Sequence, residues 1–352
     1  MATFYELFCG CAERWPDNVA LEIQRRDRVE SNTYAELRHM AESIGRWLTE
    51  KGFQQGTRIA IVADNHPRWI ASYLGIIAAG CTAVPLDTAF HADQIRKLLE
   101  DSGSSLVFCD RKHWLVAEES IGKLNIGIVI IDNGTGVRAA TNAAQAGESP
   151  VPTISSLDVI LAAGPGDFIP LACTDDSVAC LLYTSGTTAD PKGVMLTHAN
   201  LLGEVRAVFS WAHIGPEDVL LGVLPLFHVL SQMANLLLPL VKGSRVVYLE
   251  TLNTTELLRA LAERQITAFA VVPQFFYLIH ERIFKEVSQR GRVAAWAFRI
   301  MMSVTQFSRS LGWNPGPILF PKVHSIFGGK MRYLVTGGSR FDPRIGRDFH
   351  AL

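Results

Sequence analysis

The chain has 352 residues, of which 48% are hydrophobic and 19% charged, and its formal net charge is -1. This length allows about two to three domains or one large α/β domain, and the apolar content is sufficient for a sizeable core, which excludes global disorder. Because 33 Lys and Arg are balanced by 34 Asp and Glu, the chain has no general electrostatic affinity for nucleic acid. We therefore expect no nucleic-acid partner.

Alternating helices and strands are predicted over the first part of the chain. We expect a helix over 4–15, a strand over 19–23 and a helix from Thr33 to about Glu50, which a capping box opens. Further elements are expected at 58–63 (strand), 67–79 (helix), 81–86 (strand), 91–101 (helix) and 104–109 (strand). This alternation indicates an α/β architecture with a largely parallel sheet.

The longest uncharged run, Trp69 to Leu86, is close to the minimum length of a membrane span. We interpret it instead as a buried helix, a stop at Gly80 and a strand that ends at Pro85. The N-terminal segment lacks the basic region and apolar core of a signal peptide. Cys9 and Cys11 could form half of a metal site, but no second pair with ligand spacing follows. We expect a reduced, cytoplasmic protein.

The middle of the chain changes character twice. Residues 133–176 are rich in Gly, Ala, Ser, Thr and Pro, which favours a surface linker. A strand over 178–183 follows, and extended structure resumes at 194–196 before Thr197 caps a helix. The intervening loop is therefore predicted to join two antiparallel strands.

A second series of α/β units is predicted after residue 218. Strands are expected at 219–224, 244–249, 267–272 and 331–336, and helices at 228–241, 254–264, 274–288 and from Pro343, with a mostly helical stretch over 290–330. The apolar run 224–241 contains His228, Gln232 and two prolines, so we expect it to form core or tunnel lining.

The loop after the strand 178–183 concentrates groups that bind phosphate. It contains Thr184, Ser185, Gly186, Thr187 and Thr188, and Lys192 follows. Backbone N–H groups around small residues can converge on a phosphate, hydroxyls add donors, and the lysine adds a full charge. The segment is not a Walker loop, because no Gly-Lys-Ser/Thr triplet opens a helix.

This segment resembles the phosphate loop of the AMP-forming acyl-activating enzymes, which reads Thr-Ser-Gly-Thr-Thr-Gly-x-Pro-Lys-Gly. The chain departs from that pattern at Ala189, where alanine would cost about 1 kcal/mol or more if the position needs a positive φ. The resemblance implies that the five loop residues and Lys192 hold the β- and γ-phosphates of ATP, that Lys192 is catalytic, and that Thr184 is a Mg²⁺ ligand.

Two further motifs resemble parts of an acyl pocket in the same family. Leu224–His228 resembles its Pro-x-Phe-His motif, which implies that Phe227 and His228 line the carboxylate end and that His228 is catalytic. The alternative is a buried histidine that caps a helix. Val272 and Pro273 resemble the start of an acyl-pocket helix, to which Phe276 would contribute, but plain core packing explains an aromatic stripe equally well.

The strand that ends in Gly337, Gly338 and Ser339 resembles the segment that packs against adenine in this family, since a Gly-Gly pair allows close approach of a flat ligand. His198 and Asn200, just after the phosphate loop, are interpreted as cap and packing residues. The resemblance implies the large N-terminal domain of adenylate-forming enzymes, with two similar α/β subdomains of mixed or parallel sheets and helices packed between them. The first would span 1–180, with a linker near 133–176, and the second 181–352, with the phosphate loop and acyl pocket.

The stretch Trp296–Phe327 is most similar to the long-chain members of the family. The resemblance implies activation of a long-chain fatty acid with ATP and Mg²⁺ to acyl-AMP, then to acyl-CoA with CoA as co-substrate. Motifs of the family's last third and its small C-terminal catalytic domain are absent from these 352 residues, so we expect this chain alone to be inactive and that domain to be a partner. Alternatives are a fatty-acyl-AMP ligase that delivers to a carrier protein and a non-catalytic acyl- or nucleotide-binding module. A homodimer and a weak peripheral membrane contact are further expectations.

Overall fold

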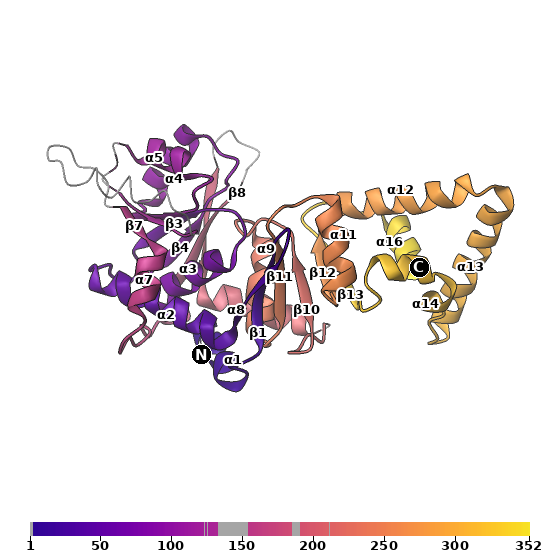
Figure 1. The fold of residues 1–352 in the computed structure, drawn as a ribbon, viewed down its shortest axis with the longest axis horizontal. Helices are drawn as coiled ribbons and strands as arrows, with labels where there is room; N and C mark the ends of the chain where they lie inside the picture. Colours follow the sequence, from indigo (N-terminus) through magenta and orange to yellow (C-terminus); the bar gives the residue numbers. More distant parts are fainter. Residues whose placement is uncertain (1–2, 123, 125, 133–153, 185–190, 211) are drawn as a thin grey trace. The chain divides into compact units, whose positions relative to one another are not determined.

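The computed structural model describes residues 3–352 except 123, 125, 133–153, 185–190 and 211. The protein is a mixed α/β structure whose strands are mostly parallel (Figure 1). Contacts along the chain define two compact units, residues 1–217 with 225–250 and residues 218–224 with 251–352. The expected division into two subdomains near residue 180 stays a prediction.

The first unit is built on a seven-stranded sheet with the order β7-β6-β5-β3-β4-β8-β9. Its strands are β3 (Arg58–Val62), β4 (Thr82–Pro85), β5 (Leu106–Cys109), β6 (Gly127–Ile130), β7 (Ile154–Ser156), β8 (Val178–Thr184) and β9 (Lys192–Thr197). All neighbours are parallel except β8 and β9, which are antiparallel. Nearly every residue of β3, β4 and β5 is buried, as in a parallel sheet covered on both faces. The predicted largely parallel sheet is confirmed.

Up to residue 217, the described helices of this unit are α1 (Phe4–Arg14), α2 (Tyr34–Glu50), α3 (Pro67–Ala78), α4 (Ala92–Ser102), α5 (Trp114–Ile121), α7 (Leu157–Ala163) and α8 (His198–Phe209). The predicted capping box is present: Thr33 N donates to Glu36 Oε2 at 2.8 Å, and Glu36 N donates to Thr33 Oγ1 at 3.1 Å. The uncharged run 69–86 divides into α3 and β4, as expected, and Gly80 between them has a φ of 72°. Among the described residues, no helix is long and apolar enough to cross a membrane.

The described part of the stretch 133–176 contains two elements that the sequence did not reveal. β7 pairs with β6, and α7 follows it directly. Leu157 and Ile160 of α7 are buried, which anchors this short helix on the unit. A strand of three residues and a helix of seven residues are too short to give a clear hydrophobic period.

A second group of strands in this unit comprises β1 (Val19–Gln24), β2 (Val29–Thr33) and β11 (Arg245–Leu249), in the order β11-β1-β2. β2 forms an antiparallel hairpin with β1 and was not predicted, because its polar sequence lacks an apolar pattern. The buried Tyr34 hydroxyl donates to the carbonyl oxygens of Pro239 and Ser244, at 3.1 and 2.7 Å. Those bonds join the start of α2 to the segment before β11.

The apolar run 224–241 forms α9 (Val229–Gln232), a π-helical turn η1 (Met233–Leu237) and α10 (Leu238–Leu240). Ser231, Gln232 and Asn235 are almost completely buried, which confirms that the run is part of the core. The predicted single helix is therefore interrupted, and π-turns within helices are frequent at functional sites.

The second unit contains β10 (Val219–Gly222), β12 (Ala268–Val271) and β13 (Tyr333–Thr336), parallel and in the order β13-β12-β10. The residues just before these strands are joined by hydrogen bonds. The fully buried Asp218 accepts from Thr267 Oγ1 at 2.6 Å and from Arg332 Nη1 at 2.8 Å. This three-residue contact aligns the amino ends of all three strands.

Six helices complete the second unit: α11 (Thr254–Glu263), α12 (Pro273–Gln289), α13 (Arg292–Ser310), α14 (Gly316–Leu319), α15 (Pro321–Ile326) and α16 (Pro343–Ala351). Ile283, Met302, Phe320 and Leu352 form a small core between them. The mostly helical stretch predicted over 290–330 is confirmed.

We expect Gly75→Ala to lower the free energy of unfolding by about 1–3 kcal/mol, because overpacking a filled core forces the backbone or side chains apart. A Cβ at Gly75 would lie 2.6 Å from Ile44 Cβ and 2.8 Å from the Ala41 carbonyl oxygen, where α2 and α3 pack together. Gly10→Ala is the matched control, since no atom in the described part of the chain lies within 4 Å of a Cβ there, and it should be neutral or stabilising by about 0.5–1 kcal/mol. Urea-induced unfolding of both variants decides the matter, and equal stabilities would contradict the close packing.

A second prediction concerns acid stability at the start of α3. His66 Nδ1 accepts from Arg68 N at 3.0 Å, and burial together with the cations Arg25 and Arg68 lowers the pKa of His66 to about 4. The unfolded chain protonates this histidine near pH 6.5, so its contribution is complete above that pH and is lost as the pH falls toward 4. His66→Asn keeps a cap without the titration. The free energy of unfolding between pH 7 and 5 should therefore decline less steeply in His66→Asn than in the unchanged protein; parallel slopes would rule the effect out.

Candidate functional site

The predicted phosphate loop connects two antiparallel strands of the first unit. Thr184 at the end of β8 pairs with Lys192 at the start of β9, and both side chains are exposed. This confirms the hairpin arrangement expected from the sequence. Ser185, Gly186, Thr187 and Thr188 lie outside the described residues, as does Ala189, so their predicted roles stay predictions.

The base of this hairpin is hydrogen-bonded to a neighbouring helix. The Tyr183 hydroxyl donates to Asp101 Oδ2 at 2.5 Å, which ties the end of β8 to α4. Burial and the neighbouring Asp101 carboxylate raise the pKa of Tyr183 well above its usual value, so it stays a neutral donor. A Cβ at Gly193 would lie 3.1 Å from Leu181 Cδ1, so glycine suits this tight crossing. Thr184 and Lys192 therefore pair at a hairpin base that is bonded to α4.

The residues that follow β9 act as expected for caps and packing. Thr197 N donates to Asn200 Oδ1 at 3.0 Å, and Asn200 N donates to Thr197 Oγ1 at 3.2 Å, which forms the cap of α8. His198 is buried, and burial lowers the pKa of its imidazole. Both residues lie after the end of β9 that is away from Lys192, where they cap and pack α8.

The Pro-Leu-Phe-His motif forms a turn in the same unit. His228 N donates to the Pro225 carbonyl oxygen at 3.1 Å, and the rings of Phe227 and His228 have centroids 4.4 Å apart. His228 precedes α9, but its side chain is exposed and makes no cap hydrogen bond. The alternative of a buried, capping histidine is therefore wrong.

Asn65 holds this turn and was missed from the sequence. Leu226 N donates to Asn65 Oδ1 at 2.9 Å, and the Leu226 side chain is buried. Asn65 follows β3 and stands next to His66, the N-cap of α3. An Asn-His-Pro run is recognisable as a helix start, but its contact with a residue 161 positions away leaves no local signal.

The turn and the hairpin are brought to one edge of the seven-stranded sheet. Asn65 follows the carboxyl end of β3 and Thr184 ends β8, with the parallel strand β4 between them. Ligands of open α/β sheets bind outside the carboxyl ends of the strands. This edge of the first unit is therefore the candidate site for phosphate and carboxylate groups.

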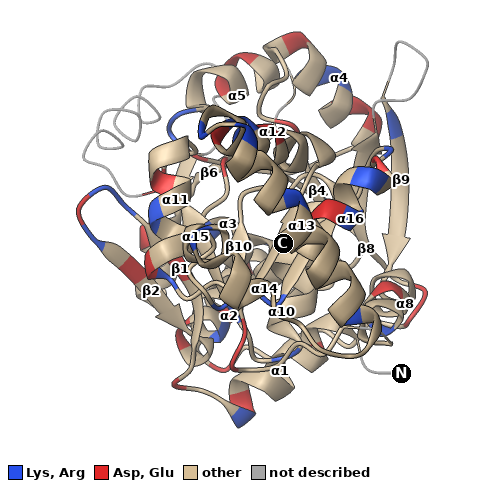
Figure 2. Ribbon diagram, turned by 90° about the vertical axis from the view of Figure 1, so that its right-hand side faces the viewer, with Lys and Arg blue, Asp and Glu red and all other residues tan. Residues whose placement is uncertain are grey.

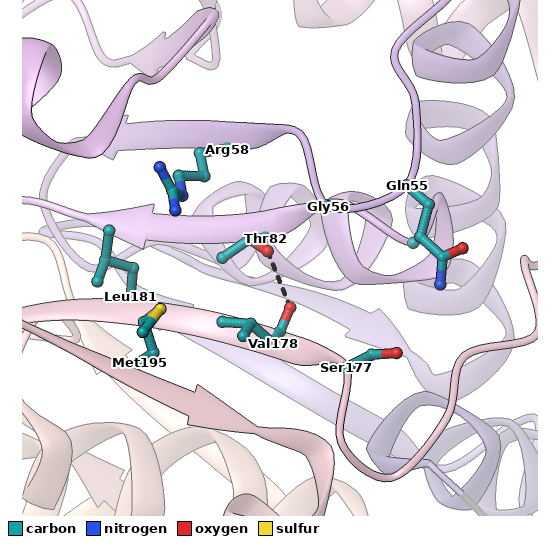
Figure 3. Close-up of a pocket in the computed structure, with 9 residues that line it drawn as sticks. Gln55, Gly56, Arg58, Thr82, Ser177, Val178, Leu181 and Met195 are labelled. Carbon is teal, nitrogen blue, oxygen red and sulfur yellow. Dashed lines mark hydrogen bonds between the residues drawn. The ribbon is translucent and has the colours of Figure 1, made fainter.

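A cavity of about 210 Å³ in this unit lies at the opposite ends of the same strands. Arg58, Thr82 and Val178, which begin β3, β4 and β8, line it, and Thr82 Oγ1 donates to the Val178 carbonyl oxygen at 2.8 Å (Figure 3). Because it opens at the amino ends of the strands, the cavity is separate from the candidate site.

Asp64, Asp110 and His113 also cluster at the carboxyl ends of β3 and β5. Asp110 accepts hydrogen bonds from Asp64 N at 2.8 Å and from His113 N at 2.9 Å, and it contacts His113 Nδ1 at 2.7 Å. Burial by itself would raise the pKa of Asp110, but these bonds outweigh it and lower the pKa. Asp64 in turn pairs with Lys112 Nζ at 2.6 Å. The cluster therefore organises two loops.

In the second unit, two predicted segments meet at one edge. Val271 pairs with Thr336 across β12 and β13, so Val272 and Gly337 follow at adjacent strand ends. Gly338 has a φ of 81°, and no atom of the described residues lies within 4 Å of the position of a Cβ, so the chain there is open to a flat group. Ser339 is exposed, and Pro273 is buried in the first turn of α12. The segments predicted to contact adenine and acyl group thus lie side by side.

The Phe276 side chain is buried in an aromatic cluster and does not face an open pocket. It is buried, and its ring centroid lies 4.9 Å from that of Phe349 and 5.3 Å from that of Phe341, both in edge-on geometry. These contacts join α12 to α16 and to the segment before it. Core packing accounts for them, and an acyl-binding role for Phe276 stays a prediction.

Comparisons with known proteins agree with this architecture. The family model for the AMP-binding enzymes matches residues 10–352. Long-chain-fatty-acid–CoA ligase 1 of Cavia porcellus is 26% identical over 356 residues, with 96% of this chain and 50% of that protein covered. Long-chain-fatty-acid–CoA ligase FadD15 of Mycobacterium bovis is 28% identical over 329 residues, with 89% and 52% covered. The chain thus spans about half the length of these curated relatives.

Solved structures show the same fold. The adenylation domain of a carboxylate reductase from Mycobacterium chelonae has a TM-score of 0.81 at 19% identity. The matched region covers 99% of this chain and 56% of that domain's chain. The N-terminal domain of FACL13 from Mycobacterium tuberculosis has a TM-score of 0.72 at 20% identity, and the matched region covers 100% of this chain and 73% of that one. Identities this low establish the fold alone, whereas the family model spans nearly the whole sequence. The chain therefore belongs to the family of AMP-binding enzymes.

Proposed function

We propose that the protein takes part in the ATP-dependent activation of a long-chain fatty acid. The carboxylate of the acid attacks the α-phosphate of ATP, which gives acyl-AMP and releases pyrophosphate, and the thiol of CoA then displaces AMP to form acyl-CoA. This proposal is supported by the position of the Thr184–Lys192 pair and of the turn bonded to Asn65 at the same edge of the seven-stranded sheet, in a chain of the AMP-binding family. The long-chain ligases among its relatives support the choice of acid.

In this proposal, charge neutralisation is the main task of the hairpin. Lys192 and the hydroxyl and backbone donors of Thr184–Thr188 hold the β- and γ-phosphates, because nucleotidyl transfer depends on positioning and on stabilisation of developing charge. The Thr184 hydroxyl is a hard oxygen ligand of the kind that suits Mg²⁺. Bound there, Mg²⁺ would supply further neutralisation of phosphate charge.

The remaining segments are assigned to substrate recognition. Phe227 and His228 would orient the carboxylate, with the exposed His228 imidazole as a donor to its oxygens. Val272, Pro273 and Phe276 would contribute to the acyl pocket. Gly337, Gly338 and Ser339 would lie against adenine, where the open space at Gly338 leaves room for a flat ring.

The chain of 352 residues is proposed to carry only part of the catalytic apparatus, with a C-terminal catalytic domain as its partner. It would then bind substrates with little or no turnover, in the cytoplasm and as a monomer or homodimer.

The reaction products distinguish this function from the two alternatives, a fatty-acyl-AMP ligase and a non-catalytic binding module. Incubation of the complete gene product with ATP, Mg²⁺, CoA and labelled palmitate should yield palmitoyl-CoA. Acyl-AMP without thioester would select the acyl-AMP ligase, and absence of both would select the binding module. Robust thioester formation by the 352-residue chain alone would contradict the proposed division of labour.

We expect Lys192→Ala to weaken ATP binding by about tenfold, since a charge-assisted contact to phosphate is removed. Lys97→Ala, which removes another exposed lysine from α4 of the same unit, is the matched control and should leave the affinity unchanged. Isothermal titration of ATP into each variant gives the dissociation constants. Equal affinities for the two variants would remove Lys192 from the phosphate site.

Asn65 provides a test of the Phe227–His228 turn. Asn65→Leu removes the acceptor for Leu226 N, and we expect fatty-acid affinity to fall about two- to tenfold, which corresponds to one lost hydrogen bond. Asn65→Asp keeps an acceptor oxygen at that position and should retain most of the affinity. Displacement of a fluorescent fatty acid by palmitate measures both. A similar loss in both variants would mean that the Leu226 contact does not position the turn.

A further inference from the structure

One helix of the second unit exposes a continuous apolar stripe. On α13 and the residue that ends it, large side chains recur at intervals of three and four: Val293, Trp296, Ile300, Val304, Phe307 and Leu311. Successive helical positions differ by about 100°, so these six lie within an arc of roughly 80°. Their exposed fractions run from 42% at Ile300 to 81% at Val293. Isolated apolar residues on a surface are ordinary, but a contiguous patch of this length marks an interaction surface.

The opposite face of α13 makes the distribution more informative. This face packs on α12 and α16, and its buried positions include Met302, Thr305 and Ser308. The helix therefore buries two hydroxyl side chains, while Trp296 and Phe307 stay in water. A surface helix of a soluble protein ordinarily turns its apolar stripe toward the core. α13 also packs Phe298, Met301 and Met302 into the core of the unit. The outer stripe is therefore a second apolar face of the same helix, which indicates that it has an apolar partner of its own.

The charged residues of the segment that carries the stripe have a single sign. No Asp or Glu occurs from Val287 to Phe341, whereas eight residues in this interval are Lys or Arg. Arg292 and Arg299 flank one side of the stripe, and neither forms an ion pair with any residue in the described ranges. The distribution of charged residues is coloured in Figure 2. The partner of this face should therefore combine an apolar interior with negative surface charge.

We propose that the outer face of α13 docks on the surface of an anionic lipid bilayer. The helix would lie in the plane of the interface, with Trp296 and Phe307 among the upper acyl chains and the arginines extended toward lipid phosphates. α13 is not long and apolar enough to cross the bilayer, which suits a helix that lies on it. A second copy of the chain would meet the same stripe with like charges, so the bilayer is the better match. The inference depends on α13 alone and is independent of the proposed reaction.

Co-sedimentation with vesicles tests the proposal on the 352-residue protein. We expect binding to vesicles of phosphatidylcholine with about 30% phosphatidylglycerol and much weaker binding to phosphatidylcholine alone, since basic residues near an anionic surface each add attraction. An increase in NaCl from about 0.05 to 0.5 M should weaken binding to the anionic vesicles, because salt screens exposed charges. Absence of binding to anionic vesicles at low salt would overturn the proposal.

Two pairs of substitutions locate the contact. Trp296→Gln with Phe307→Gln should reduce partitioning at least about tenfold, from the loss of two inserted aromatic side chains. Leu115→Gln, a change at a side chain on α5 with 73% exposure, is the matched control and should have no effect. Arg292→Gln with Arg299→Gln should lower binding to anionic vesicles several-fold, whereas Lys97→Gln should not.

All these positions are exposed, so the substitutions should not disturb folding. Circular dichroism and thermal unfolding of each variant distinguish a loss of binding from misfolding. Equal binding by the stripe variant and the Leu115 control would contradict a contact through α13. Dimerisation that the stripe substitutions abolish, without vesicle binding, would instead identify a second copy as the occupant and would also overturn the proposal.

Discussion

The parallel pairing of strands is the constraint on which the placement of most candidate segments depends. Parallel strands bring all their carboxyl ends to one edge, so segments far apart in sequence are presented together without any direct attraction between them. In the first unit this rule gathers Asn65 after β3 and Thr184 at the end of β8. In the second it sets Val272 beside Gly337, because Val271 and Thr336 share a register.

Register needs a physical cause at the other end of the strands, and in the second unit a buried carboxylate supplies it. Asp218 is removed from water and is compensated by Thr267 and Arg332, which precede the two neighbouring strands. A buried carboxylate without such donors is costly. A shift of either strand by one residue would remove a hydrogen bond to Asp218 and would therefore destabilise the fold. The contact thus fixes, from about a strand's length away, which residues emerge at the edge where ligands are proposed to bind.

Local signals were sufficient for part of this structure. The capping boxes at Thr33 and Thr197 depend on residues three positions apart, and the hairpin between β8 and β9 could be deduced because extended structure resumes before the helix begins. The polar strand β2 and the short α7 could not be predicted, because their stability comes from pairing and packing with distant segments. The contact between Asn65 and Leu226 belongs to the same class, since it is made by the fold and leaves no periodic trace.

The orientation of α13 shows why an average over the sequence can conceal a functional property. A formal net charge of -1 excludes a general affinity for anions, yet an interval of 55 residues within the same chain carries eight cations and no acid. The apolar period of α13 is equally plain in the sequence, but a period alone predicts burial. Only the structure shows that Thr305 is inside and Trp296 outside. Composition, period and burial therefore have to be considered together, because the same stripe would mean core packing on one face of the helix and recognition on the other.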